Sequence, residues 1–456
     1  MASDYIGFDY GTSNCAVGIM NNGQPEILSL GEHGRFIPST LYAPSRDIIS
    51  YWLYQQLPEA EQAQFKTERR LALQKGQNAL RELKLDGIPT DLSFGKPALA
   101  SYLDEPEEGY YIKSPKSFLG ASGLVDAQIH LFEDIVAAMM SNIKTLAEQA
   151  KQSDINKTVI GRPINFQGLK GEESNQQAIQ VLTNAAKRVG FKEIEFQYEP
   201  VAAGFDYEAS LTQETRVLVV DIGGGTTDCS MLLMGPKHIT KTTRHEQLLA
   251  HSGIRIGGND FDIRIALKGI MPSLGMNSLL KTGKPMPVNN FSRAVAINNI
   301  NDQTEFYSQK NRRDLLLLQR DAVEADVFAR LIKVHDHKLS YRLVNGAEQA
   351  KIGLTDHDKQ TIKLNDLADN LTVDVSRQLM LEASTNQLTQ IGQMMHEAVQ
   401  QANCQPDVIF VTGGTAKSPV LSQFLRQQMP NTPIIIGDHF GSVTVGLARW
   451  AERVFS

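Results

Sequence analysis

The strongest constraint in this sequence is a pattern that occurs twice. The apolar stretch Tyr5–Met20 is interrupted by a turn of small and polar residues, Asp9-Tyr-Gly-Thr-Ser-Asn14. The stretch Arg216–Met234 repeats this layout around Asp221-Ile-Gly-Gly-Gly-Thr-Thr-Asp228. Two apolar runs joined by such a turn are typical of a β-hairpin. Because the two aspartates stand nearly half of the 456-residue chain apart, the sequence predicts an internal duplication.

Other segments predict a mixture of strands and helices. A third strand, Asp407–Thr412, runs into the glycine pair Gly413-Gly414. Apolar residues at three-to-four spacing predict three long amphipathic helices. These helices are expected over Ile129–Lys151, Gln176–Val189 and Gln378–Ala402. Strands and helices mixed in this way favour an α/β protein.

Two stretches are expected to be insertions in this fold. Residues 46–92 are polar and helix-prone, and residues 269–340 open with proline and glycine and continue as a charged helix around Leu315–His335. The histidines of His335-Asp-His337 could suggest a metal site, but we interpret them as structural. Neither insertion carries chemistry that the sequence identifies.

Composition excludes several classes of function. The net charge of −6 and the pI of about 6.0 argue against a nucleic-acid binder. Three dispersed cysteines form neither a disulfide framework nor a zinc site. We see no signal peptide at the start of the sequence and no apolar run of the roughly 20 residues that span a bilayer. A cytoplasmic protein without membrane contact is expected.

The two turns have the chemistry of a phosphate site. Glycine N–H groups in a tight turn form an anion-binding concavity, and hydroxyl or amide side chains add donors. The predicted phosphate-binding residues are Gly11, Thr12, Ser13, Asn14, Gly223, Gly224, Gly225, Thr226 and Thr227. Asp9 and Asp221 would repel phosphate but can hold a hydrated Mg²⁺. Two such turns facing each other would clamp a triphosphate and its metal, whereas one glycine turn alone would more often be a mobile turn.

These residues lead to a family resemblance. The chain resembles the heat shock protein 70 (DnaK-type) chaperone family within the actin-like ATPase superfamily, and among its members the short YegD-like proteins. The likeness runs through nearly the whole chain except the two insertions. It is carried by Ile6–Asn14, Lys116–Gly120, Thr158–Pro163, Glu199–Ala203, Asp221–Asp228, Ile256–Asp262, Glu348–Thr355 and Gly413–Pro419. The motifs Gly-Gly-Asn-Asp-Phe-Asp262 and Glu348-Gln-Ala-Lys-Ile favour the chaperone branch over kinases and actins.

The resemblance implies a fold of two lobes. It implies a duplicated actin-like ATPase fold with ribonuclease H-like halves and a central nucleotide cleft. Lobe I would comprise residues 1–207, with the helix at 443–456 packing back on it, and lobe II residues 208–456. The sequence ends at Ser456, about where the peptide-binding domain of typical family members would begin, so that domain is expected to be missing.

The resemblance also implies catalytic roles. Asp9 and Asp221 would organise hydrated Mg²⁺, and Glu199 would help place the attacking water. Lys116 would reach the terminal phosphate and Thr226 would bond the γ-phosphate. Taken without the family, Glu199 is an acid at a helix N-terminus, ahead of Pro200.

Further residues would bind the nucleotide, with adenosine between one helix that carries Glu348, Lys351 and Thr355 and the turn at Gly413, Gly414 and Lys417. They are Gly257, Gly258, Glu348, Lys351, Thr355, Gly413, Gly414 and Lys417. K⁺ is a possible second cation. Without the resemblance, Lys351 would be a charge on a helix face, and Lys113 competes with Lys116 for the phosphate.

Three positions depart from the family pattern. Lys417 replaces the arginine that stacks on adenine, and lysine lacks its planar guanidinium. Asn259 replaces an acid, and Phe440-Gly441 stands where the family has an acidic pair. A weaker grip on the nucleotide is therefore expected.

Three functions remain open from the sequence. The first is slow, Mg²⁺-dependent ATP hydrolysis by a monomeric chaperone-family protein, with client or co-chaperone proteins binding through the insertions. The second is a small-molecule, sugar-type kinase. The third is an ATP-dependent conformational switch or filament protein with little hydrolysis.

Overall fold

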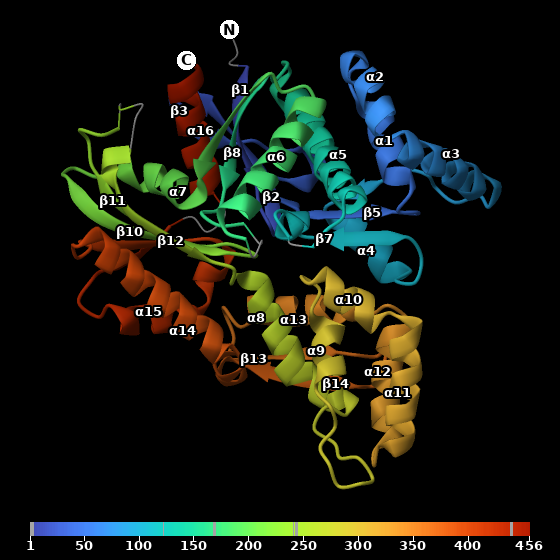
Figure 1. The fold of residues 1–456 in the computed structure, drawn as a ribbon. Helices are drawn as coiled ribbons and strands as arrows, with labels where there is room; N and C mark the ends of the chain where they lie inside the picture. Colours follow the sequence, from blue (N-terminus) through green and yellow to red (C-terminus); the bar gives the residue numbers. More distant parts are fainter. Residues whose placement is uncertain (1–3, 122, 167–169, 240, 242–244, 438–440) are drawn as a thin grey trace. The chain divides into compact units, whose positions relative to one another are not determined.

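A computed structural model describes residues 4–121, 123–166, 170–239, 241, 245–437 and 441–456 (Figure 1). The chain divides into two compact units. Unit 1 comprises residues 1–255, 393–416 and 430–456. Unit 2 comprises residues 256–392 and 417–429. Each unit is described by itself below.

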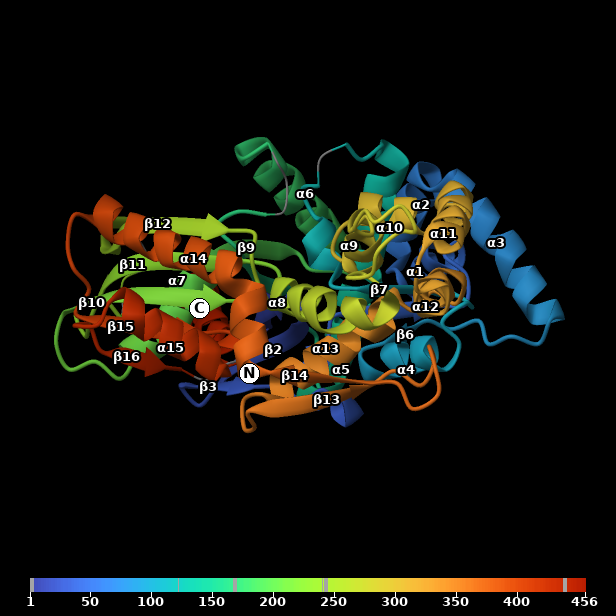
Figure 2. The same ribbon diagram turned by 90° about the horizontal axis from the view of Figure 1, so that it is seen from below.

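Unit 1 contains two large sheets in which equivalent strands lie in the same spatial order. The first has the order β3-β2-β1-β8-β9, and the second has the order β12-β11-β10-β15-β16, whose strands are labelled in Figure 2. The first sheet consists of β1 (Tyr5–Tyr10), β2 (Asn14–Asn21), β3 (Gln24–Ile27), β8 (Lys157–Arg162) and β9 (Glu193–Tyr198), with β4 (Ile37–Pro38) paired to β2. The second consists of β10 (Thr215–Ile222), β11 (Thr227–Met234), β12 (Leu248–Ile254), β15 (Val408–Thr412) and β16 (Ile434–Ile436).

Strand pairing repeats from one sheet to the other. β1 pairs antiparallel with β2 and parallel with β8. β10 pairs antiparallel with β11 and parallel with β15. Both predicted hairpins and the third strand are confirmed. The repeated order confirms the α/β class and the duplication of an actin-like fold.

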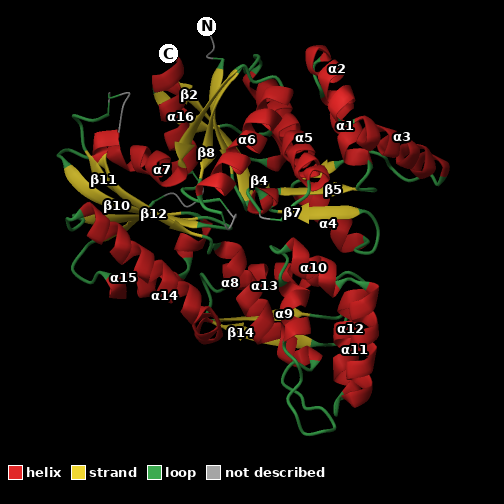
Figure 3. Cartoon of the chain, viewed as in Figure 1, coloured by secondary structure: helices red, strands yellow, loops and turns green. Residues whose placement is uncertain are grey.

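Helices and strands alternate in the same succession in each half, and Figure 3 shows the helices in red and the strands in yellow. In the first half α5 (Asp126–Lys151), α6 (Glu172–Arg188) and α7 (Glu199–Glu208) accompany β8 and β9. In the second half α14 (Arg377–Ala402), α15 (Pro419–Gln428) and α16 (Ser442–Phe455) accompany β15 and β16. The three predicted long helices are thus confirmed as α5, α6 and α14.

The predicted insertion at 46–92 is helical. It forms α1 (Ile48–Gln56), α2 (Glu59–Glu68) and α3 (Arg70–Leu85). Next to it, a small sheet has the order β6-β5-β7, formed by β5 (Thr40–Ala43), β6 (Ser93–Phe94) and β7 (Tyr110–Lys113), with α4 (Lys96–Asp104) beside it. Buried Arg69 ties the insertion to α5 through Glu133 (2.8 Å) and Asp134 (3.1 Å).

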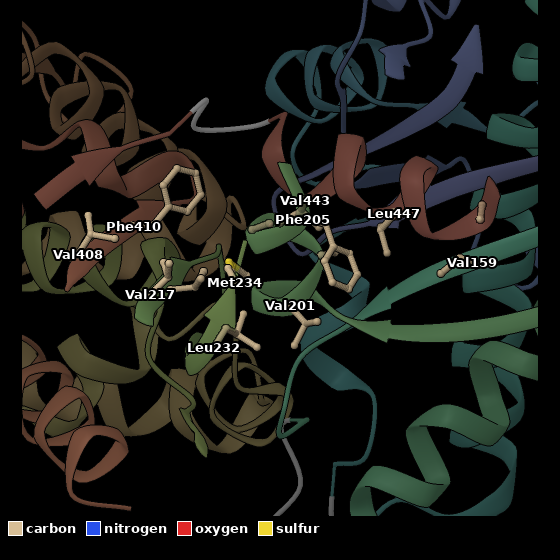
Figure 4. Close-up of a cluster of buried hydrophobic side chains, with 14 residues drawn as sticks. Val159, Val201, Phe205, Val217, Leu232, Met234, Val408, Phe410, Val443 and Leu447 are labelled. Carbon is tan, nitrogen blue, oxygen red and sulfur yellow. The ribbon is translucent and has the colours of Figure 1, made fainter. Parts of the chain in front are cut away.

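The last helix of each half packs against the sheet of the other half. α16 lies on β1, β2 and β8, while α7 lies on β10 and β11, and the two helices contact each other. A Cβ at Gly446 would collide with the carbonyl of Ala202, so the helices cross backbone to backbone. Figure 4 shows the core at this crossing. Its labelled side chains are Val159, Val201, Phe205, Val217, Leu232, Met234, Val408, Phe410, Val443 and Leu447.

Unit 2 is mostly helical. Its helices before α14 are α8 (Gly258–Ile265), α9 (Asn289–Val295), α10 (Ile300–Phe306), α11 (Gln309–Asp321), α12 (Ala325–Asp336) and α13 (Ser340–Gly353), followed by the hairpin β13 (Lys359–Lys363) and β14 (Thr372–Ser376). The charged helix predicted around Leu315–His335 is wrong as one element. The chain between α11 and α12 leaves the helix, where Ala322 is extended and pairs with Leu280.

The lobe boundary between residues 207 and 208 stays a prediction. The central nucleotide cleft also stays a prediction. Within the described residues, no helix combines the length and the apolar character needed to cross a membrane.

Candidate active site

The turn of the first hairpin is closed by its own backbone. A Cβ at Gly11 would collide with the carbonyl oxygen of Asn14, so this position needs glycine. Ser39 fastens the turn from outside: its hydroxyl donates to the Gly11 carbonyl (2.7 Å) and its N–H donates to the Ser13 carbonyl (2.9 Å). Thr12 and Asn14 lie in the same turn, partly exposed.

The turn of the second hairpin reaches the first one. Its backbone is closed by the Gly223 N–H, which donates to the Thr226 carbonyl at 2.9 Å. A Cβ at Gly224 would collide with the Ser13 hydroxyl and would stand 3.0 Å from the Ser13 nitrogen. The two glycine turns predicted from the sequence are therefore brought together, both inside unit 1.

The third glycine loop lies against the second hairpin. Gly413 has a φ of +91°, and a Cβ there would collide with the backbone of Ile222. This left-handed conformation and the close approach both require glycine. Gly414 follows as the first residue of a short 3-10 helix, Gly414–Lys417.

A buried ion pair lies at the same place. Lys116, 4% exposed, donates through Nζ to Oε1 of Glu199, which is 8% exposed, and to the Gly161 carbonyl at 3.4 Å. Glu199 is the first residue of α7, where an acid is favoured by the helix dipole. Lys113 lies in β7 and is partly exposed. It is thus Lys116 whose ammonium group meets Glu199.

Three aspartates interact electrostatically with this ion pair. Burial and then the Glu199 carboxylate raise the pKa of Asp9 to about 7, against the lowering effects of Lys116 and of the Thr444 hydroxyl at 3.2 Å. Burial, Glu199 and Asp228 raise the pKa of Asp221 well above its ordinary value. The Glu199 carboxylate thus raises the pKa of each of the three aspartates, and the buried Lys116 lowers it.

Asp228 is a residue that our sequence predictions missed. It lies directly opposite Asp221 in the β10–β11 register and is 1% exposed. Burial first and Glu199 second raise its pKa to about 7. Its Oδ1 accepts from the Ile164 N–H at 2.9 Å, while Oδ2 is buried without a hydrogen-bond partner among the described residues. The signal was in the sequence, because a hairpin turning between Asp221 and Asp228 places them face to face.

The donor set suits a hydrated cation. Among the residues that the structure describes, no three His, Cys, Asp or Glu side chains converge closely enough to chelate a metal directly. Mg²⁺ keeps several waters and needs only one or two carboxylates beside a phosphate. The unsatisfied Asp228 oxygen and the crowded carboxylates fit such a group.

The remaining predicted residues lie in unit 2. Gly257 and Gly258 open α8, where the Asp260 carboxylate accepts from the Gly257 N–H at 2.8 Å and the Asp260 N–H donates to the Gly257 carbonyl at 3.0 Å. Lys351 on α13 is bound to α8: its Nζ donates to the Gly258 carbonyl at 3.0 Å and pairs with buried Asp262 at 2.8 Å. The structure therefore gives Lys351 a packing role within unit 2.

The other predicted positions in unit 2 differ in their exposure to solvent. Glu348 is partly exposed on α13, and Lys417 is exposed. The prediction of one helix through Thr355 is wrong at its end, because α13 stops at Gly353 and Thr355 lies in the following turn. Asn259 is 3% exposed. Phe440 lies outside the described residues.

Comparisons with known proteins agree with the predicted family. A family model for Hsp70 proteins matches residues 125–269, from α5 through the second hairpin to the end of α8 and the π-helical turn after it. The chain is 28% identical over 265 residues to the chaperone protein DnaK of Carsonella ruddii, covering 58% of this chain and 39% of that protein. It is 27% identical over 266 residues to the chaperone protein HscA of Proteus mirabilis, with 57% and 36% covered. It is 27% identical over 268 residues to the chaperone protein dnaK1 of Prochlorococcus marinus, with 57% and 34% covered.

The matched region thus corresponds to about two fifths or less of each curated relative. The likeness to YegD-like members stays a prediction. The duplicated fold, the paired glycine turns and these matches agree that the chain is similar to Hsp70 chaperones, with the family model matching residues 125–269.

Proposed function

We propose that this protein binds ATP with Mg²⁺ and slowly hydrolyses the bond between its β- and γ-phosphates. The observation that supports this most is the buried Lys116–Glu199 pair. It stands beside Asp9, Asp221 and Asp228, at the place where the two glycine turns meet. Hydrolysis of a phosphoanhydride depends on positioning and charge stabilisation, and this arrangement offers donors, one buried cation and acids for a metal.

The phosphates would lie along the two turns. N–H groups of Gly11, Gly223, Gly224 and Gly225, with the hydroxyls of Thr12, Ser13 and Thr226 and the Asn14 side chain, would donate to phosphate oxygens, as the predicted roles require. Asp9 and Asp221 would accept hydrogen bonds from the waters of Mg²⁺. When bound, the metal supplies positive charge to the phosphate oxygens. Asp228 is a further acceptor for that hydration shell or for K⁺.

The attacking water would be held by Glu199. Its Oε1 accepts from Lys116, which leaves Oε2 to accept a hydrogen bond from water and orient the lone pair. The same contact keeps the Lys116 ammonium group at the edge of the site, where it can donate to a terminal phosphate oxygen. Because both side chains are buried, their charges act with little screening.

We further propose that adenosine binds to Gly257, Gly258, Glu348, Lys351, Thr355, Gly413, Gly414 and Lys417. Since Lys351 is already engaged with Asp262, its contact with ribose would be additional to its packing role. Lys417 brings charge without a planar stacking surface, so the affinity for adenine should be modest.

The role in the cell is proposed from the family. A cytoplasmic, monomeric chaperone-type protein would couple the nucleotide state to a client or co-chaperone bound at 46–92 or 269–340. No observation favours a sugar-type kinase or a filament-forming switch. The tests below distinguish all three.

The first test measures binding and turnover on one sample. Calorimetric titration with ATP and Mg²⁺ should show one site per chain, and single-turnover hydrolysis should follow. Glu199→Gln should slow hydrolysis by about 10²-fold and Lys116→Met by about 10²–10³-fold. Lys113→Met is the matched control and should hydrolyse at the original rate.

Each alternative has its own outcome. Unchanged hydrolysis in Glu199→Gln would refute the catalytic assignment. ADP release stimulated by a sugar or acid would favour the kinase. Tight binding without turnover, with ATP-dependent light scattering, would favour the switch or filament.

A further inference from the structure

An aromatic ring stands immediately before the catalytic acid. Tyr198 is the last residue of β9 and precedes Glu199, the first residue of α7. In the parallel β8–β9 register Tyr198 lies opposite Arg162. The Arg162 guanidinium carbon stands 4.8 Å from the centroid of the Tyr198 ring, a cation–π distance.

The Tyr198 ring also stacks on a residue of the second sheet. His251 of β12 has its ring centroid 5.7 Å from that of Tyr198, with 26° between the planes. Burial and then Arg162 lower the pKa of His251, which favours the neutral form of its ring. Through these two contacts Tyr198 of β9 connects Arg162 of β8 in the first sheet with His251 of β12 in the second.

The Arg162 guanidinium is held by the backbone. Arg162 donates from Nε to the Pro163 carbonyl at 3.2 Å and from the NH2 nitrogen to the Ile164 carbonyl at 3.3 Å. These bonds fix its planar group relative to the strand that carries it. Tyr198 therefore contacts a preorganised cation.

The same segment of chain touches three parts of the site. Gly161, the residue before Arg162, accepts from Lys116 and lies so close to Glu199 that a Cβ would stand 3.2 Å from its Cγ. Ile164, two residues after Arg162, donates to Asp228 at 2.9 Å. A shift of Tyr198 relative to Arg162 would consequently move Glu199 relative to both Lys116 and Asp228.

We propose that Arg162, Tyr198 and His251 form a brace that positions Glu199 to orient the attacking water, with Tyr198 as the member that contacts both of the others. Tyr198 is a positioning residue, since it acts through Glu199. The inference rests on the proposed ATP hydrolysis at Glu199. The brace should affect the rate of hydrolysis and not the affinity for the nucleotide, because the glycine turns that would bind phosphate are held separately by Ser39 and Ser13.

A second stack on the same helix provides a matched control. Tyr207, near the carboxyl end of α7, has its ring 4.8 Å from that of Phe410 with 18° between the planes. Removing this ring takes a similar aromatic contact from α7 but leaves the residue before Glu199 unchanged. The pair Tyr198→Ala and Tyr207→Ala separates positioning from general packing of the helix.

The experiment uses the full chain and the variants Tyr198→Ala, Tyr198→Phe, Tyr207→Ala and Glu199→Gln. For each, single-turnover hydrolysis and the Kd for Mg·ATP are measured. Hydrogen exchange is followed in peptides covering the first turn of α7. Misplacing a reacting group by about 1 Å can cost about 10²-fold in rate. Tyr198→Ala should slow hydrolysis about 10- to 100-fold with an unchanged Kd and faster exchange at residues 199–203, while Tyr198→Phe and Tyr207→Ala should keep the rate.

The outcomes distinguish the brace from the proposed function. If Glu199→Gln is slow but Tyr198→Ala hydrolyses at the original rate, the brace is overturned while the function stands. If Tyr198→Ala and Tyr207→Ala lose the same rate, the contact is ordinary packing and the brace is again overturned. If the unmodified chain shows no hydrolysis, the proposed function fails, and exchange alone decides: faster exchange at 199–203 in Tyr198→Ala only supports the brace, and equal exchange in both variants overturns it.

Discussion

The two hairpins share a backbone layout but differ in charge. Opposite Asp9 in the first hairpin stands Ala16, whereas opposite Asp221 in the second stands Asp228. The first hairpin thus carries one acid and the second carries two that face each other. Because like charges directly opposite each other across two strands are destabilising, the second hairpin has an electrostatic cost that the first does not have.

The turns differ in a second way. The first has one glycine, Gly11, with Thr12, Ser13 and Asn14 as side-chain donors, and the second has three successive glycines. Gly11 and Gly223 both stand two residues after the aspartate. A Cβ at Gly11 meets backbone, while one at Gly223 would be 3.4 Å from the nearest atom, an ordinary contact. The first turn is therefore the tighter of the two.

Lys116 is shared by both hairpins, so its removal should have the largest effect. It lowers the pKa of Asp9, Asp221 and Asp228 alike. Lys116→Met should reduce the free energy of unfolding by about 3–5 kcal/mol at pH 8, because it leaves Glu199 buried and unpaired. Urea denaturation measures this. Lys113→Met is the control, and a loss in Lys116→Met below about 1 kcal/mol would show that the ion pair contributes little.

The two glycines should respond unequally to the same change. Gly11→Ala should cost about 2–3 kcal/mol, since the new methyl group forces the backbone of the turn apart. Gly223→Ala should change the free energy of unfolding by less than about 1 kcal/mol. Chemical denaturation of the two variants side by side gives the difference, and equal losses would contradict the tighter packing of the first turn.

The extra acid of the second hairpin should show in the pH dependence. The folded pKa of Asp228, about 7, lies above its ordinary value of 3.8, so the folded state binds the proton more tightly. Stability from this group is present below pH 3.8 and is lost as the pH rises towards 7. Asp228→Asn should therefore remove part of the fall in stability between pH 5 and pH 8, on the order of 1–2 kcal/mol.

Denaturation of metal-free and nucleotide-free protein at several pH values measures that slope. Asp407→Asn is the control, because Arg216 lowers the pKa of Asp407 and its titration lies outside this window. A slope that is the same in Asp228→Asn and in the original protein would mean that Asp228 ionises freely in the folded state.

The smallest effect is expected at the support of Asp9. Its Oδ2 accepts from the Thr444 hydroxyl of α16, a hydrogen bond that stabilises the ionised carboxylate. Thr444→Val should raise the pKa of Asp9 further and cost about 1 kcal/mol at pH 8. Thr385→Val, on the exposed side of α14, is the control because its hydroxyl bonds only within its own helix. A loss in Thr444→Val no larger than in this control would show that the Thr444–Asp9 hydrogen bond adds no more stability than a hydrogen bond within α14.

Local patterns were sufficient for much of the fold. Alternation of apolar segments and small-residue turns predicted both hairpins, and three-to-four spacing predicted α5, α6 and α14, because these features depend on neighbours in sequence. The error around Leu315–His335 has the same origin. Its apolar residues continue with helical spacing, but the chain leaves the helix at Ala322, which pairs with Leu280, and the backbone of Lys281 and Val323 bonds across the same two segments.

The site was predictable in composition but not in arrangement. Asp9, Asp221, Lys116 and Glu199 were identified through their motifs, and their roles stay predictions. The ion pair between Lys116 and Glu199 joins residues 83 positions apart, and nothing local indicates it. Asp228 could have been found from the hairpin register, but its bond to Ile164 could not.

The sequence by itself determined that two copies of one hairpin unit exist, which residues turn them and which acids they carry. Only the tertiary structure decided that Gly224 meets Ser13, that α7 and α16 each pack on the sheet of the other half, and that Tyr198 contacts both Arg162 and His251. The reason is physical. Turns and amphipathic faces are properties of neighbouring residues, whereas burial, ion pairing and the resulting pKa shifts depend on which distant segments pack together.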